Sequence, residues 1–243
     1  MQITDEAIIL STSKYGENSG IACILTESHG IYKGLVRGIT GKRQRGIYQS
    51  GNIIEAIWRA RLSEHLGNLS AGLIHAGAMM LMDEPVKLAA LSSLCAMLET
   101  TLQERDPVPT IYHDFKTLLK ELGAGDNNWH KTYVLLELEL LAQLGFGLDL
   151  TTCAATETTE DLIYVSPKSG RAVCRIAGRP YADKLLKLPE FLLADLQEEK
   201  EISCAEINEG LNLCSYFFDK YFFAPHNIHQ PQARARFVAM LKY

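Results

Sequence analysis

The sequence lacks the features that mark membrane and exported proteins. No apolar run approaches the roughly 20 residues that a membrane-spanning helix requires. The first ten residues contain acids and do not have the basic start that precedes the apolar core of a signal peptide. We therefore expect a cytoplasmic protein that has no membrane partner.

Motifs of the common enzyme classes are also missing. The chain has no G-x-S-x-G elbow and no H-E-x-x-H, and its carboxylates are scattered along predicted helix surfaces. Gly41 and Lys42 are followed by Arg43, whereas a Walker loop needs Ser or Thr there to hold magnesium, and no dinucleotide fingerprint is present. We predict no catalytic residues. An enzyme is the first alternative, and hydrolase and nuclease assays with magnesium would reveal it.

Cysteine pairs at short spacing are absent as well. The chain has six cysteines and no C-x-x-C pair, and no signal peptide places them in an oxidising compartment. Most of them are expected to be small core residues. They are Cys23, Cys95, Cys153, Cys174, Cys204 and Cys214.

Positive charge is concentrated in one part of an acidic chain. The 243 residues are 47% hydrophobic and 22% charged, with a net charge of -5, as in an ordinary folded protein of one or two domains. Residues 33–61, however, contain seven basic residues and a single acid, Glu55. We predict that these cations contact a negatively charged partner. They are Lys33, Arg37, Lys42, Arg43, Arg45, Arg59 and Arg61.

The centre of this region, IYKGLVRGITGKRQRGIY, divides into two halves. The first half alternates as a strand does. The second half is polar and is interrupted by Gly38, Gly41 and Gly46, which predicts a mobile loop whose side chains lie in solvent. The alternative is an ordinary solvated loop without a partner.

Five short β-type segments separated by turn residues fill the first 80 residues, which predicts a small antiparallel barrel. The five-stranded OB-fold is the natural candidate, and one face of such a barrel commonly binds oligonucleotides. An SH3-like barrel has a similar pattern. The predicted strands are Ala7–Ser11, Ile21–Thr26, Ile31–Val36, Asn52–Trp58 and Asn68–Leu73.

Helical periodicity replaces this pattern after about residue 76. A small hairpin-like insertion is predicted at about 149–189, so the fold class is α+β, with a barrel over residues 1–80 and a mainly helical domain over 81–243. Ser203 and Glu206 predict a capping box. The predicted helices are 86–102, 110–122, 129–144, 189–198, 207–223 and 233–241, and the third is apolar almost all round.

A series of turn motifs runs along the chain: YGENS (15–19), TESHG (26–30), VRG (36–38) before the basic loop, YQ (48–49), LLAQLGFGLDLTTC (140–153) and YVSPKSGRAV (164–173). Each motif alone is modest, but together they cover most of the chain. Their order and spacing resemble those of the RecO family of bacterial recombination mediators.

This resemblance implies an OB-fold followed by a helical domain, without enzymatic turnover. RecO-like proteins bind single- and double-stranded DNA, anneal strands coated by single-stranded-DNA-binding protein, and with RecR help to load RecA. The seven cations are then predicted to contact DNA phosphates, which would place the protein at the nucleoid. Tyr32, Tyr48 and Trp58 could stack on bases, although strand aromatics are more often core residues. The second alternative is an adaptor that binds proteins and touches DNA weakly.

The resemblance also raises the question of zinc, because some RecO proteins carry a four-cysteine zinc site in the insertion. Cys153 matches its first cysteine, but Thr156 occupies the position that would complete a close pair, and Cys174 alone lies nearby. A structural zinc site needs four ligands. His226 and His229 are too distant in sequence to be assumed as the others. We predict a degenerate zinc finger, with no metal and no cofactor.

RecO proteins further dock the acidic C-terminal tail of single-stranded-DNA-binding protein on the helical domain. The tail ends in an apolar residue and a carboxylate, so it needs an apolar pocket with a cation at its rim. We predict this pocket at Trp129, His130, Lys131 and Tyr133, at the start of the third helix, where the helix dipole favours an anion. The alternative is that Trp129 and Tyr133 anchor the helix in the core.

Overall fold

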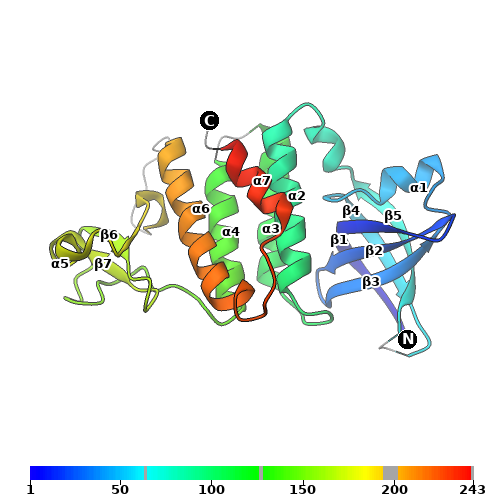
Figure 1. Cartoon of the computed structure of the whole chain (residues 1–243). Helices are drawn as coiled ribbons and strands as arrows, with labels where there is room; N and C mark the ends of the chain where they lie inside the picture. Colours follow the sequence, from blue (N-terminus) through cyan, green and yellow to red (C-terminus); the bar gives the residue numbers. More distant parts are fainter. Residues whose placement is uncertain (63–64, 126–127, 194–201, 242–243) are drawn as a thin grey trace. The chain divides into compact units, whose positions relative to one another are not determined.

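The computed structural model describes residues 1–62, 65–125, 128–193 and 202–241 (Figure 1). The chain forms two compact units, which we call unit 1 and unit 2. Unit 1 consists of Met1–Asp126 and Pro231–Phe237, and unit 2 of Asn127–Gln230 and Val238–Tyr243. None of the described helices has both the length and the hydrophobicity that crossing a bilayer requires.

Unit 1 begins with a closed five-stranded barrel in the order β1-β2-β3-β5-β4. A parallel pairing of β3 with β5 closes it, while the other neighbours are antiparallel. This is an OB-fold-like barrel, and the five predicted strands are confirmed. They are β1 (Gln2–Tyr15), β2 (Ser19–Thr26), β3 (Gly30–Arg37), β4 (Ile53–Arg59) and β5 (Gly67–His75).

Strand alternation builds the barrel core. In β1, Ile3, Ala7 and Ile9 face inward. The strand pairs with β4 from Gln2 to Ile8 and with β2 from Ala7 to Tyr15, with a bulge between Ile9 and Ser11 in its pairing with β2. Tyr32 and Trp58 meet edge to face inside the barrel, with ring centroids 5.1 Å apart.

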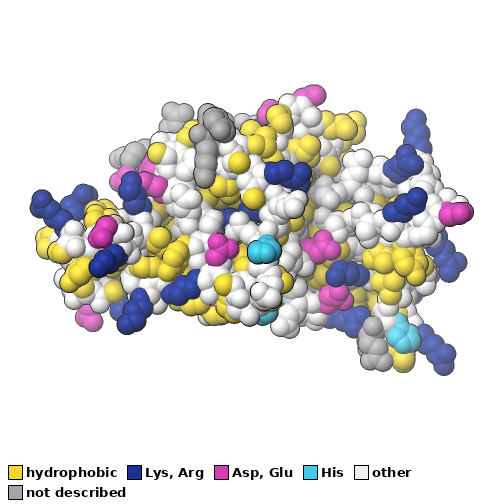
Figure 2. Space-filling view, in the orientation of Figure 1, with side chains coloured by type: hydrophobic (Ala, Val, Ile, Leu, Met, Phe, Trp, Pro, Cys, Tyr) yellow, Lys and Arg dark blue, Asp and Glu magenta, His cyan; other side chains and the backbone are white. Residues whose placement is uncertain are grey.

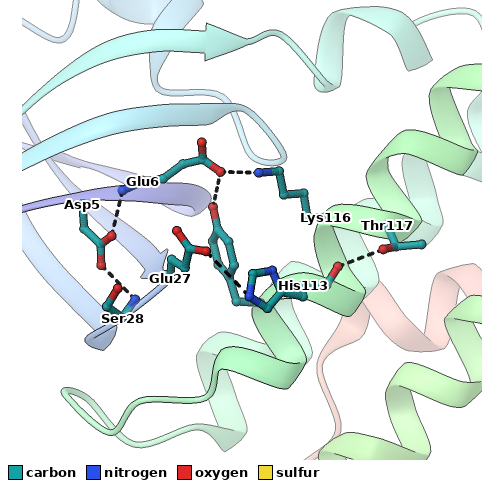
Figure 3. Close-up of polar contacts among 8 residues, drawn as sticks. Asp5, Glu6, Glu27, Ser28, His113, Lys116 and Thr117 are labelled. Atoms are coloured by element: carbon teal, nitrogen blue, oxygen red, sulfur yellow. Dashed lines mark hydrogen bonds and ion pairs between the residues drawn. The ribbon is translucent and has the colours of Figure 1, made fainter.

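Two long helices follow the barrel in unit 1, and both start at a proline. They are α2 (Pro85–Thr101) and α3 (Pro109–Ala124), preceded by the 3-10 turn η1 (Ala78–Leu81). The carboxylate of Glu6 on β1 accepts hydrogen bonds from the Tyr112 hydroxyl at 2.7 Å and from Lys116 Nζ at 2.6 Å on α3 (Figure 3). These bonds, Lys116 foremost, lower the pKa of Glu6.

The boundary between the two compact units differs from the domain boundary that we predicted at residue 80. Helix α2 lies against β1, and α3 is tied to β1 through Glu6, so both belong with the barrel. The loop between these helices also approaches the barrel closely, because a Cβ atom at Gly30 would lie 2.0 Å from the carbonyl oxygen of Asp106. A compact unit follows side-chain contacts rather than the change from strands to helices.

In unit 2, α4 packs against α6, which starts at the predicted capping box of Ser203 and Glu206. The insertion is a three-stranded sheet in the order β7-β6-β8 instead of a hairpin. Of the helix predicted over 189–198, the described part contains only the 3-10 turn η3, and residues 194–201 lie outside the described residues. The elements are α4 (Trp129–Gln143), β6 (Leu162–Val165), β7 (Ala172–Cys174), α5 (Arg175–Gly178), η2 (Arg179–Tyr181), β8 (Leu186–Lys187), η3 (Glu190–Leu192), α6 (Cys204–Phe218) and the π-helical turn η4 (Asp219–Phe223); α7 (Gln232–Met240) contributes to both units.

Candidate nucleic-acid interface

The basic segment after β3 is a short helix, α1 (Lys42–Ile47), so the prediction of a loop was wrong. Ile47 inserts into the barrel core. The buried side chain of Asn52 donates to the carbonyl oxygens of Gly46 at 2.8 Å and Ile47 at 3.0 Å, which satisfies the open carbonyl end of the helix. The barrel therefore holds α1 in a fixed place.

Helix α1 presents its cations to solvent. Lys42, Arg43 and Arg45 are all exposed, and the first turn of the helix has no acid. In the part of the chain that the structure describes, none of the three forms a salt bridge. Figure 2 shows dark blue side chains gathered at this end of unit 1. The prediction that these side chains lie in solvent is confirmed.

A groove of about 450 Å³ runs beside α1 across the ends of β3, β4 and β5. Arg37 on β3 and Arg59 on β4 line it, together with Gln44 of α1 and Asn68 and Ser70 of β5. Among the described residues that line this groove there is no acid. Guanidinium groups and neutral amides on one surface can bind phosphates without selecting bases.

Two of the seven predicted cations, Lys33 and Arg61, lie neither on α1 nor in the lining of this groove. Lys33 forms a salt bridge with Glu104, at 3.1 Å, and the hydrogen bond to Glu104 raises the pKa of Lys33. Its charge is thereby offset. Arg61 is exposed beyond the end of β4 and does not line the groove.

The predicted stacking platforms are core residues. Tyr32 and Tyr48 are each 5% exposed and Trp58 is 1% exposed. The indole N–H of Trp58 donates to the Lys33 carbonyl oxygen at 3.0 Å, inside the barrel wall. The expectation that strand aromatics are more often core residues is therefore confirmed: strand alternation turns Tyr32 and Trp58 inward, and Tyr48, the residue that ends α1, packs in the same core.

Three polar residues that line the groove were missed by the sequence interpretation: Gln44, Asn68 and Ser70. Asn68 and Ser70 alternate with the buried Leu69 on β5, so they face outward. This period of two was visible in the sequence and could have marked them.

The chain matches known proteins over nearly its whole length. The family described as "Recombination protein O N terminal" matches residues 1–77, and "Recombination protein O C terminal" matches residues 82–227. A DNA repair protein RecO of Rhodospirillum centenum is 42% identical over 240 residues, covering 98% of this chain and 94% of that protein. Its counterpart in Rhodospirillum rubrum is 41% identical over 243 residues, covering 98% and 96%.

This chain belongs to the RecO family. The family resemblance led to a predicted partner pocket on α4, and the structure corrects two of its residues. Trp129 is 3% exposed and Tyr133 is 1% exposed, so both rings are buried, while His130 and Lys131 are half-buried. Apolar positions at i and i+4 form a surface patch only where nothing else packs on them.

Cys153, Thr156 and Cys174, at the predicted degenerate zinc finger, form hydrogen bonds with one another. The Cys174 backbone N–H donates to Cys153 Sγ at 3.2 Å, and the Thr156 hydroxyl lies 3.6 Å from Cys174 Sγ. Burial alone would raise the pKa of the Cys153 thiol, but hydrogen bonds from Thr156 and from the N–H groups of Cys174 and Ala155 lower it to about 6. Across the described residues, no group of three or more His, Cys, Asp or Glu is placed to hold a metal. The residues present do not fit a zinc ion.

We expect purified protein to contain much less than one zinc per chain by elemental analysis. Thr156 stands where a ligand is required, and two thiols cannot complete a tetrahedral site. Cys153→Ser should leave the zinc content unchanged, which serves as the control. One zinc per chain in the wild-type protein would contradict this prediction, and its loss in Cys153→Ser would assign the metal to this cysteine.

Proposed function

We propose that this protein is a non-enzymatic DNA repair and recombination mediator of the RecO type, which binds single- and double-stranded DNA through the barrel. The observation that carries the proposal is the surface formed by α1 and the adjoining groove, where Arg37, Lys42, Arg43, Arg45 and Arg59 occur without a lining acid among the described residues. Lysine and arginine release counterions from phosphates of any sequence.

The same surface supports strand annealing. Annealing brings together two polyanions whose bases must stay free to pair with each other. A protein that holds phosphates by cations, without aromatic rings between the bases, neutralises both strands and leaves their base edges open. The burial of Tyr32, Tyr48 and Trp58 agrees with this requirement.

The further partners of the proposal are single-stranded-DNA-binding protein, RecR and, indirectly, RecA. The family membership supports them. Of the four residues predicted for the acidic tail of single-stranded-DNA-binding protein, His130 and Lys131 are half-buried, whereas the rings of Trp129 and Tyr133 are buried.

The proposal is tested by fluorescence energy transfer between complementary labelled strands coated with single-stranded-DNA-binding protein. The protein should accelerate annealing of the coated strands, and added RecR should change the rate. Absence of annealing together with weak, salt-insensitive DNA binding would favour the alternative, a protein adaptor, because a DNA binder must show a steep salt slope.

A further inference from the structure

The segment that joins β5 to α2 exposes an unusual amount of apolar surface. Within ten residues, Leu73, Ile74, Met79, Met80 and Met82 are between 45% and 70% exposed, and this stretch contains no acid, lysine or arginine. Exposed apolar clusters of this kind mark binding sites, and a methionine side chain adapts its shape to what it contacts. The cluster is therefore a candidate binding surface.

Three of these side chains, Leu73, Met79 and Met82, line a groove of about 610 Å³ beside α1, which we call the α1 groove. The two methionines are three residues apart at the 3-10 turn η1 and its cap, and this spacing places them on one side of the turn. They are 69% and 70% exposed. The groove has the size of a small-molecule site, and both thioethers are accessible to what enters it.

The α1 groove also contains two cations of the proposed DNA interface. Lys42 and Arg43 line it, and among the described residues of its lining there is no acid. A strand whose phosphates lie on these cations therefore passes directly beside the apolar side chains. A second groove, beside α3 and called the α3 groove, contains Met80, but its described lining includes none of the seven cations predicted to contact DNA.

We propose that Met79 and Met82 contact the faces of unpaired DNA bases while Lys42 and Arg43 hold the phosphates of the same strand, so that the α1 groove favours single strands over duplex. This inference rests on the proposed DNA-binding function and adds the residues that distinguish the two forms of DNA. An unpaired base exposes an aromatic face, which a methionine sulfur contacts favourably. In a duplex the neighbouring bases cover these faces, and the phosphates alone remain for α1.

Methionine suits a protein that has to pass its strand on to a complementary one. Aromatic rings stack strongly on bases, whereas a methionine side chain makes a weaker contact with the same face. No aromatic ring occurs among the described residues that line the α1 groove. A contact through the base faces also leaves the hydrogen-bonding edges free to pair during annealing.

The test measures binding of the full chain to fluorescein-labelled oligo(dT) and to a duplex of the same length, by fluorescence anisotropy over a range of salt concentrations. Met79→Ser with Met82→Ser should weaken oligo(dT) binding about tenfold, because bases no longer cover apolar surface there. The duplex affinity should not change. The salt slope should also stay the same, since no phosphate contact is lost.

Two further variants serve as controls. Met80→Ser, in the α3 groove, should change neither affinity. Met79→Leu with Met82→Leu should retain the affinity for oligo(dT), because leucine restores the apolar surface with nearly the same volume.

An abasic strand tests the same contact from the side of the DNA. Such a strand keeps the phosphates and lacks the bases, so the wild-type protein should bind it about tenfold more weakly than oligo(dT). The double serine change should not weaken this binding further.

Unchanged oligo(dT) affinity in the double serine variant would overturn the inference and leave the α1 groove to a protein partner or a second copy of the chain. An equal loss of affinity for oligo(dT), abasic strand and duplex would overturn it too. In both cases DNA binding by the wild-type protein, with a steep salt slope, would still support the proposed function. If the wild-type protein binds no DNA, the proposed function and this inference fail together.

Discussion

Replacing Lys42, Arg43 and Arg45 together with glutamate should lower the affinity for single-stranded DNA by about a hundredfold at 0.1 M salt. Each phosphate contact on a single strand contributes about 0.7 to the slope of log affinity against log salt, so three lost contacts reduce this slope by about 2. At 0.1 M salt that reduction corresponds to about two decades of affinity. A salt titration of binding to oligo(dT) gives both quantities from one data set.

A matched control separates a local interface from a change in overall charge. Lys168, Arg179 and Lys184 are exposed cations of unit 2, and their replacement by glutamate changes the net charge by the same amount. This control should retain most of the DNA affinity. Far-UV circular dichroism should stay unchanged in both variants, because solvated side chains alter stability by only about 0.5 kcal/mol. Equal losses of affinity in the two triple variants would show that α1 is not the DNA site.

The strands of the barrel could be predicted because their signal is local. Period-two alternation in β3 turns Tyr32 and Val36 inward and Lys33 and Arg37 outward, as the structure shows. Helix α1 could not be predicted in the same way, because six residues are too few to show a 3.6-residue period. Its main support, Asn52, lies outside the segment and acts through side-chain hydrogen bonds to Gly46 and Ile47.

The position of the candidate DNA-binding groove could not be predicted from local sequence patterns. Arg37 and Arg59 reach one groove because β5 pairs with both β3 and β4, and this parallel closure joins segments that no local pattern connects. The burial of two residues of the predicted partner pocket was also beyond the sequence pattern. Trp129 and Tyr133 share one face of α4, but helical spacing cannot tell a buried face from a face that meets a ligand.

Trp58 is the largest fully buried side chain among the described residues. It is 1% exposed, packs edge to face on Tyr32 and donates its indole N–H to the Lys33 carbonyl oxygen at 3.0 Å. The backbone at Gly67 passes so close to the indole ring that a Cβ atom there would lie 2.2 Å from it. Removing the indole would leave a cavity in the barrel and remove the hydrogen bond to the Lys33 carbonyl oxygen.

Trp58→Ala is therefore expected to lower the free energy of unfolding by about 3–5 kcal/mol. Tyr15→Ala is the control, because Tyr15 is 56% exposed on the same barrel and its loss should cost no more than about 0.5 kcal/mol. Urea titrations followed by far-UV circular dichroism give both values. Trp129, the one tryptophan left in Trp58→Ala, reports on unit 2 by its fluorescence. A urea midpoint for Trp58→Ala equal to that of Tyr15→Ala would mean that the barrel closes without the indole.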